Sequence, residues 1–219
     1  YAVGTGTGIS GNLISNILGN GSYIAAASST VSGNTLFGNR TGITIGGNGA
    51  VVSGNTVRNN TDFGIVAGGF TSASVAGNIV SLNPVGIATS GTPVTGNRVF
   101  ANTTYGIDAS GVANLIQGNQ VHSNATGIRF NSFGGGYGWI LSNLVYANTT
   151  RGISIEAAGA GSRIWNNTVY SVVGDAVRLA NAPSVNISNN ILWVNAGSAI
   201  FVADGTSQTG LVSDRNLFN

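Results

Sequence analysis

The chain has 219 residues, of which 42% are hydrophobic and 6% are charged. That hydrophobic share favours a buried core, although 35 glycines would otherwise suggest disorder. Eight basic residues, all arginine, and six acidic residues give a net charge of +2 and no basic patch, so we expect no nucleic-acid partner. The sequence has no cysteine for disulfides or thiolate metal sites, and no apolar run reaches the ~18 residues of a membrane span. We therefore expect no membrane insertion and no cofactor.

A repeat of about 22 residues runs through the whole chain. Each copy is anchored on an asparagine that lies between two short apolar segments. The anchors are Asn12, Asn34, Asn55, Asn78, Asn97, Asn119, Asn143, Asn167, Asn190 and Asn216.

Apolar residues recur at three positions around each anchor. Three residues before it stand Ile9, Val31, Val52, Val75, Val94, Ile116, Ile140, Ile164 and Ile187. Two residues after it stand Ile14, Leu36, Val57, Val80, Val99, Val121, Val145, Val169, Leu192 and Phe218. Further along, within a Gly-Ile pair in most copies, come Ile43, Ile65, Ile87, Ile107, Ile128, Ile153, Val177 and Ile200. β-Branched residues dominate and glycine or asparagine separates the segments, which predicts three short strands per repeat.

Strands this short cannot bury a face alone, so stacked repeats must build the core. The sequence predicts an all-β protein: a right-handed, single-stranded parallel β-helix of about nine to ten coils that forms one domain over residues 1–219. A second set of asparagines is expected to form a ladder at a turn, with the asparagines themselves in the left-handed conformation. Its members are Asn39, Asn60, Asn83, Asn102, Asn124, Asn148 and Asn195.

The pattern I-x-G-N-x-V-x-x-N-x-x-G-I, seen from Ile116 to Ile128, resembles the parallel β-helix repeat family of pectin-lyase-like solenoids. The resemblance covers essentially the whole chain and implies the fold. That family includes polysaccharide lyases, hydrolases and epimerases, phage tailspikes and non-catalytic surface proteins. The resemblance therefore leaves the function open.

One short element resembles a catalytic motif of that family. Asn60-Thr61-Asp62 is similar to the Asn-Thr-Asp element of polygalacturonase-type hydrolases. The Asp-Asp, Gly-His-Gly and Arg-Ile-Lys elements that should follow it are absent, as is the Asp-Pro-His-Asp pattern of alginate epimerases. We find no second acid or base that the repeat would bring beside it, so the sequence favours a protein without catalytic residues.

The repeat register pairs six of the charges between neighbouring coils. The expected pairs are Arg40 with Asp62, Asp108 with Arg129, and Arg151 with Asp175. Each would be a surface pair worth about 0.2–1 kcal/mol. The register leaves Glu156, Asp204 and Asp214 without a partner.

Ring-bearing residues occupy the third position after five consecutive anchors. They are Phe100, His122, Tyr146, Tyr170 and Trp193. Because the second position points inward, these rings should form an exterior strip roughly 20 Å long. Such a strip could stabilise the sheet by stacking across coils, contact another protein, or bind a glycan.

We expect both ends of the solenoid to be uncapped. By spacing, Tyr1-Ala2-Val3 falls in the third strand of a coil, whereas Phe218-Asn219 follows the second strand of the last one. Two copies docked head-to-tail would complete the missing coil and propagate as a filament. The alternative is that the chain is a segment of a longer protein.

Low charge, short turns and paired charges favour a non-catalytic structural β-solenoid, extracellular or at the cell surface, such as a filament, surface-layer or adhesin subunit. The alternative is a carbohydrate-binding or polysaccharide-processing β-helix that uses the aromatic strip as its platform.

Overall fold

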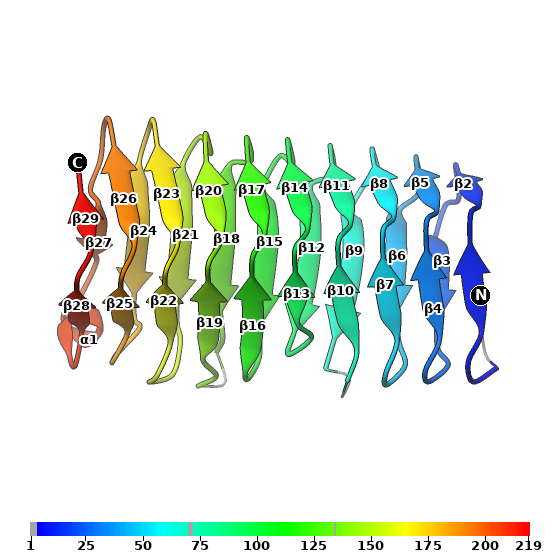
Figure 1. Ribbon diagram of the computed structural model, residues 1–219, viewed down its shortest axis with the longest axis horizontal. Coiled ribbons are helices and arrows are strands. Elements are labelled where there is room, and N and C mark those ends of the chain that lie inside the picture. The colour runs from blue at the N-terminus through cyan, green and yellow to red at the C-terminus, as the bar shows by residue number, and fades with distance from the viewer. Residues whose placement is uncertain (1–3, 70–71, 134) are drawn as a thin grey trace.

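The computed structural model describes residues 4–69, 72–133 and 135–219. The expected third-strand position of Tyr1-Ala2-Val3 lies outside these residues. Three parallel sheets run side by side along the molecule (Figure 1). The first and second sheets have ten strands each and the third has nine, with one strand from each of the first nine coils. The prediction of a parallel solenoid with three strands per turn is confirmed.

The first sheet precedes each anchor asparagine. It consists of β1 (Gly8–Ser10), β4 (Thr30–Ser32), β7 (Val51–Ser53), β10 (Ser74–Ala76), β13 (Val94–Thr95), β16 (Asn114–Gln117), β19 (Gly138–Leu141), β22 (Arg163–Trp165), β25 (Asn186–Ser188) and β28 (Val212–Asp214).

The second sheet follows each anchor. It consists of β2 (Leu13–Ser15), β5 (Thr35–Phe37), β8 (Thr56–Arg58), β11 (Ile79–Ser81), β14 (Arg98–Phe100), β17 (Gln120–His122), β20 (Leu144–Tyr146), β23 (Thr168–Ser171), β26 (Ile191–Val194) and β29 (Leu217–Phe218).

The third sheet carries the Gly-Ile pairs. It consists of β3 (Asn20–Ile24), β6 (Thr41–Ile45), β9 (Phe63–Gly68), β12 (Val85–Ser90), β15 (Tyr105–Ser110), β18 (Thr126–Asn131), β21 (Arg151–Glu156), β24 (Asp175–Ala180) and β27 (Ile200–Val202). The short helix α1 (Gly205–Gln208) follows β27 and is capped by Asp204, whose carboxylate accepts from the Ser207 N–H at 2.8 Å. The sequence did not predict this helix.

The core consists of the predicted apolar ladders, except in the last coil, where the side chain of Phe218 is exposed. Val94 pairs with Val75 on one side and Ile116 on the other, and all three side chains are fully buried. The ladder through Val99 on the second sheet and the ladder through Ile107 on the third sheet are arranged in the same way. Burial of stacked β-branched side chains is therefore repeated coil after coil, and it is the main stabilising contribution of this fold.

Both asparagine ladders form, and they lie inside the corners of the coil. The Asn97 backbone N–H and its side-chain NH₂ group both donate to the Asn119 Oδ1, at 2.9 and 3.0 Å. The same arrangement is repeated from Asn12 to Asn216 in the first ladder and from Asn39 to Asn148 in the second. The prediction that the second ladder continues to Asn195 is wrong: Val172 occupies the intervening place, and the exposed Asn195 donates to the Tyr170 hydroxyl instead.

The left-handed residue is the one before each asparagine, not the asparagine itself as predicted. Gly96 precedes Asn97 with φ +61°, and Ala101 precedes Asn102 with φ +55°. This residue turns the chain at the corner, so that the next side chain points inward and its amide joins the ladder.

The glycine of each Gly-Ile pair is required by space rather than by φ. A Cβ on Gly106 would lie 2.6 Å from the Gly127 carbonyl oxygen and 2.8 Å from the Asn124 Nδ2. Ala176 takes this position in the coil that precedes Asn195, whose amide is turned outward. The coil therefore accepts a methyl group at the point where the second ladder has ended.

Candidate functional site

The predicted aromatic strip lies on the outer face of the second sheet, in register on five consecutive strands. Phe100, His122 and Tyr146 stack face to face, with ring centroids 5.0 and 4.7 Å apart. Tyr170 and Trp193 instead meet edge to face at 6.3 Å. The strip is thus a parallel stack of three rings followed by an edge-to-face pair, rather than one uniform stack.

The edge-to-face pair is the accessible part of the strip. Tyr170 is 37% exposed and Trp193 is 49% exposed, whereas His122 is buried between its neighbours. A hollow of about 320 Å³ is lined by Tyr170, Trp193 and Asn195. A second hollow of about 290 Å³ is lined by Ile191, Leu192, Trp193, Leu217, Phe218 and Asn219. Trp193 therefore lines both hollows, and its half-exposed ring is accessible to a ligand.

The outer face of the second sheet is cationic. Arg58 lies over the Phe37 ring at 4.9 Å, and Arg98 lies over the Phe100 ring at 4.7 Å. No aspartate or glutamate occurs within the ten strands of this sheet. Ion pairs in the described part of the chain involve other arginines. No carboxylate there neutralises the charge of Arg58 or Arg98.

His122 lies at the centre of this face. Its Nδ1 lies 3.1 Å from the Ser123 hydroxyl, and its Nε2 is buried without a hydrogen-bond partner among the described residues. Burial lowers the pKa of His122, and the nearby charge of Arg98 lowers it further. The imidazole is therefore neutral at pH 7, which fits its place between two aromatic rings.

The outer face of the third sheet gathers most of the ion pairs. Arg129–Asp108 forms on this face as predicted, at 2.8 Å. Arg40–Asp62 also forms as predicted, at 2.7 Å, in the turns that precede β6 and β9. The third predicted pair is wrong. Although Arg151 and Asp175 are register neighbours, Arg151 turns along its own strand to Glu156 at 3.3 Å.

The carboxylates of Glu156 and Asp175 have hydrogen-bond partners as well. Glu156 also accepts from the Ser154 hydroxyl at 2.9 Å, and Asp175 accepts from the Ser198 N–H at 3.0 Å. The remaining acidic residues are engaged too: Asp204 caps α1, and Asp214 lies 3.5 Å from Arg215.

Tyr105 joins the predicted Asp108–Arg129 pair in a network, and this third member was not predicted. Arg129 donates two hydrogen bonds to the Asp108 carboxylate and a third to the Tyr105 hydroxyl at 2.8 Å. The pKa of Asp108 is raised: burial raises it, with a smaller contribution from the charge of Glu156, and the hydrogen bond and charge of Arg129 lower it only in part. Tyr105 and Asp108 lie on one strand, and Asp108 is the register neighbour of Arg129 on the next strand; this spacing is the sequence signal that could have indicated the cluster.

A small hollow of about 180 Å³ adjoins this network. Its lining residues are Val66, Ala67, Gly68, Ala88, Thr89, Ser90, Asp108 and Ser110. Short side chains form the floor, so a ligand could approach the backbone closely here. The network itself is internally satisfied, because Asp108 and Arg129 neutralise each other.

The element that resembles a hydrolase motif has structural roles here. Asn60 is a buried ladder member whose Oδ1 accepts from Asn39, and Asp62 pairs with Arg40. Within the described ranges, no group of three or more His, Cys, Asp or Glu side chains is placed to hold a metal ion, and no helix is long and apolar enough to cross a membrane.

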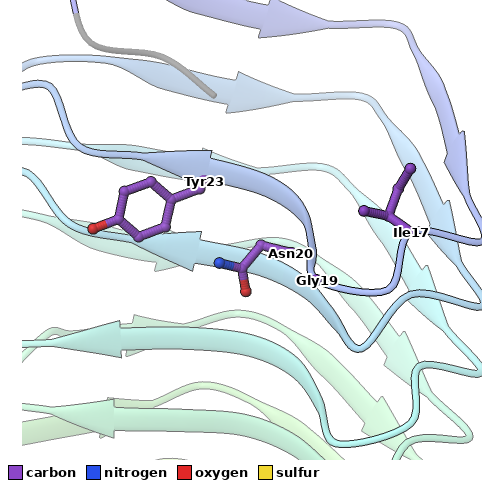
Figure 2. A pocket seen from close by; sticks show the side chains of 4 residues that line it. All are labelled: Ile17, Gly19, Asn20 and Tyr23. Atoms are coloured by element: carbon purple, nitrogen blue, oxygen red, sulfur yellow. The ribbon is translucent and has the colours of Figure 1, made fainter.

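Another hollow lies beside the first coils. It has a volume of about 550 Å³ and is lined by Ile17, Gly19, Asn20 and Tyr23 (Figure 2). Its lining contains no charged side chain, and the Asn20 amide oxygen accepts from the Thr44 hydroxyl at 3.0 Å. This hollow offers no acid–base or ionic chemistry comparable to that of the two sheet faces.

Comparison with known proteins identifies the class. The family model described as the right-handed β-helix region matches residues 1–137 and 90–218. The chain therefore belongs to the right-handed β-helix family, and the predicted handedness is confirmed. The comparison with curated proteins found no match.

Among solved structures, the chain is similar to the A-module of the mannuronan C-5 epimerase AlgE6 from Azotobacter vinelandii. The two share 13% sequence identity with a TM-score of 0.61. The match covers 89% of this chain and 65% of that module. At this identity, the similarity shows the shared fold and not a shared activity.

Proposed function

We propose that the protein binds an acidic polysaccharide along the outer face of the second sheet. The carrying observation is that this face combines an exposed aromatic pair, Tyr170 and Trp193, with two arginines that no carboxylate neutralises. Aromatic rings stack on the apolar faces of sugars, and guanidinium groups pair with carboxylates.

The similarity to a mannuronan epimerase module supports this choice of ligand, because that protein is named for acting on a polyuronate. It supports the carbohydrate-binding alternative of the sequence analysis better than a purely structural role. An acidic polysaccharide would be met outside the cell, which agrees with the expected extracellular or cell-surface location.

The ligand would contact the two halves of the face differently. Arg98 and Arg58 would pair with its carboxylates. The hollows beside Trp193 would receive sugar rings, with the Asn195 amide and the Tyr170 hydroxyl as hydrogen-bonding groups. Salt should weaken the pairs between the arginines and the carboxylates, and it should leave the contacts of the sugar rings beside Trp193 largely unchanged.

Isothermal titration of the protein with mannuronan, polygalacturonate and a neutral glucan tests the proposal. We expect binding to the two acidic polymers, at least tenfold weaker for Arg98→Gln and for Trp193→Ala. Arg40→Gln is the matched control, because it removes the same charge from an exposed pair on another face. Equal affinity for the neutral glucan, or no binding to either acidic polymer, would contradict the proposal.

A structural role remains a second proposal. It is supported by the asparagine ladder, which joins all the coils from Asn12 to Asn216 and would make the solenoid a stiff rod. Sedimentation at increasing concentration would reveal self-association, head-to-tail or otherwise. A strictly monomeric protein would contradict a role as a filament subunit.

A further inference from the structure

A second cationic aromatic site lies on the first sheet. The Arg163 guanidinium carbon is 4.9 Å from the Trp139 ring centroid and 4.7 Å from the Trp165 ring centroid. Trp139 on β19 is the register neighbour of Arg163 on β22, and Trp165 lies two residues further along β22. The strands β19 and β22 are neighbours in the first sheet (Figure 1). We call Trp139, Arg163 and Trp165 the Trp–Arg–Trp clamp.

Neighbouring residues hold the two indoles in place. The Trp165 Nε1 donates to the Asn186 Oδ1 at 2.9 Å. Trp139 packs against Tyr137, with ring centroids 5.9 Å apart. The guanidinium thus lies against two rings that have neighbours of their own, so little side-chain entropy is lost when it binds a partner.

No carboxylate neutralises the charge of this clamp. The ion pairs of the described residues involve Arg40, Arg129, Arg151, Arg178 and Arg215. Asp214, the acidic residue in the strands of the first sheet, pairs with Arg215. Arg163 is exposed, and because indoles contact its planar group, its N–H edge is the part left to bind a carboxylate.

We propose that the Trp–Arg–Trp clamp is a second carboxylate-binding site for the acidic polysaccharide. The site lies on the first sheet, which runs beside the second sheet along the molecule (Figure 1). A polymer lying along one sheet leaves the other sheet free. One protein molecule therefore bridges two polysaccharide chains.

This inference rests on the proposed function, and a fluorescence titration tests the site itself. The chain has three tryptophans, so Trp193→Phe leaves the clamp indoles as the only reporters. Short mannuronate oligosaccharides should change the tryptophan emission of this variant with saturation. The change should be lost in Trp193→Phe/Arg163→Gln and reduced in Trp193→Phe/Arg163→Lys, because lysine keeps the charge without the planar fork.

The matched control is Trp193→Phe/Arg215→Gln, which removes an arginine charge from the same end of the first sheet without touching an indole. It should titrate like Trp193→Phe. An unchanged titration in the Arg163→Gln variant, or a loss in the control, would overturn the assignment.

A cross-linking experiment tests whether one protein molecule bridges two polysaccharide chains. Wild-type protein should raise the turbidity of long mannuronan chains at a protein-to-polymer ratio near one, and Arg163→Gln should abolish this while still binding the polymer in the titration calorimeter. Stoichiometry with short oligosaccharides should fall from two sites to one. If Arg163→Gln leaves both turbidity and stoichiometry unchanged, the clamp assignment fails and the second-sheet proposal stands. If the wild type binds no acidic polymer, both fail.

Discussion

The Asn119 amide oxygen accepts two hydrogen bonds from Asn97, one from its backbone N–H and one from its side-chain NH₂ group. Asn119 also donates to the Val94 and Gln117 carbonyl oxygens, at 2.9 and 3.1 Å. A single buried amide therefore joins three coils, since Asn119 donates in turn to Asn143.

Replacing Asn119 with alanine should destabilise the protein. The change leaves the buried Asn97 backbone N–H without an acceptor and removes the donor to the Val94 carbonyl, and an unpaired buried group costs about 1–3 kcal/mol. The Asn97 NH₂ group loses one hydrogen bond but keeps those to the Val75 and Thr95 carbonyl oxygens. We expect a loss of about 2–5 kcal/mol in the free energy of unfolding, measured with urea. Gln117→Ala, whose side chain is exposed at the same corner, is the control and should lose less than about 0.5 kcal/mol. A loss of that small size for Asn119→Ala would show that the ladder contributes little.

Gly106→Ala should destabilise the third sheet by overpacking. The new methyl group would meet the Gly127 carbonyl oxygen, the Val121 Cγ1 and the Asn124 Nδ2 within 2.8 Å. We expect a loss of about 1–3 kcal/mol in unfolding free energy. The reverse change at the equivalent position, Ala176→Gly, introduces no overlap and should cost about 1 kcal/mol or less. Equal effects of the two substitutions would contradict the steric explanation.

Stability should fall between pH 7.5 and pH 5 because of His122. Its pKa is lowered in the folded state, so in this range the unfolded chain takes up the proton and the folded protein does not. The groups that lie against the imidazole are Phe100, Tyr146 and Ser123, with Arg98 close by, and none of them is a carboxylate. The unfolding free energy of His122→Phe, which keeps a ring in the stack, should depend less on pH over this range. An identical pH dependence in the two proteins would rule out His122 as the cause.

The two predicted ion pairs that form should differ in strength. Asp108→Ala leaves the Arg129 side chain, only 23% exposed, without its bidentate partner, and should cost about 1–3 kcal/mol. Asp62→Ala removes the partner of an arginine that is 68% exposed, and should cost less than about 1 kcal/mol. Urea unfolding of both variants checks the order, and a larger loss for Asp62→Ala would contradict this account.

The interior of the solenoid was predictable because the same apolar positions recur around each anchor asparagine. Inward positions such as Val94 and Val99 are apolar in nearly every coil, and the period of two along each strand then determines which side chains face outward. The aromatic strip followed from the same rule. The sequence could not show that Phe100, His122 and Tyr146 stack in parallel while Tyr170 and Trp193 do not, because ring orientation depends on the space beside each strand.

Outward contacts were less predictable because long side chains can choose among several neighbours. Arg151 lies one coil from Asp175, yet it reaches Glu156 further along its own strand. Arg163 has a register neighbour in Trp139, but its second ring, Trp165, lies on its own strand. The left-handed residue before each asparagine was missed for a related reason: glycine occupies it in some coils, but Ala101 and Leu82 occupy it in others and carry no turn signal.

The strands of the second sheet all run in the same direction, and its outer face changes from one end to the other. Arg58 and Arg98 lie toward the first coils, whereas Tyr170 and Trp193 lie toward the last. A polymer bound along the solenoid, across these strands, therefore meets arginines at one end of the face and aromatic rings at the other. Since a polysaccharide has a reducing and a non-reducing end, the protein would hold it in one orientation, with a fixed end of the sugar chain toward the arginines.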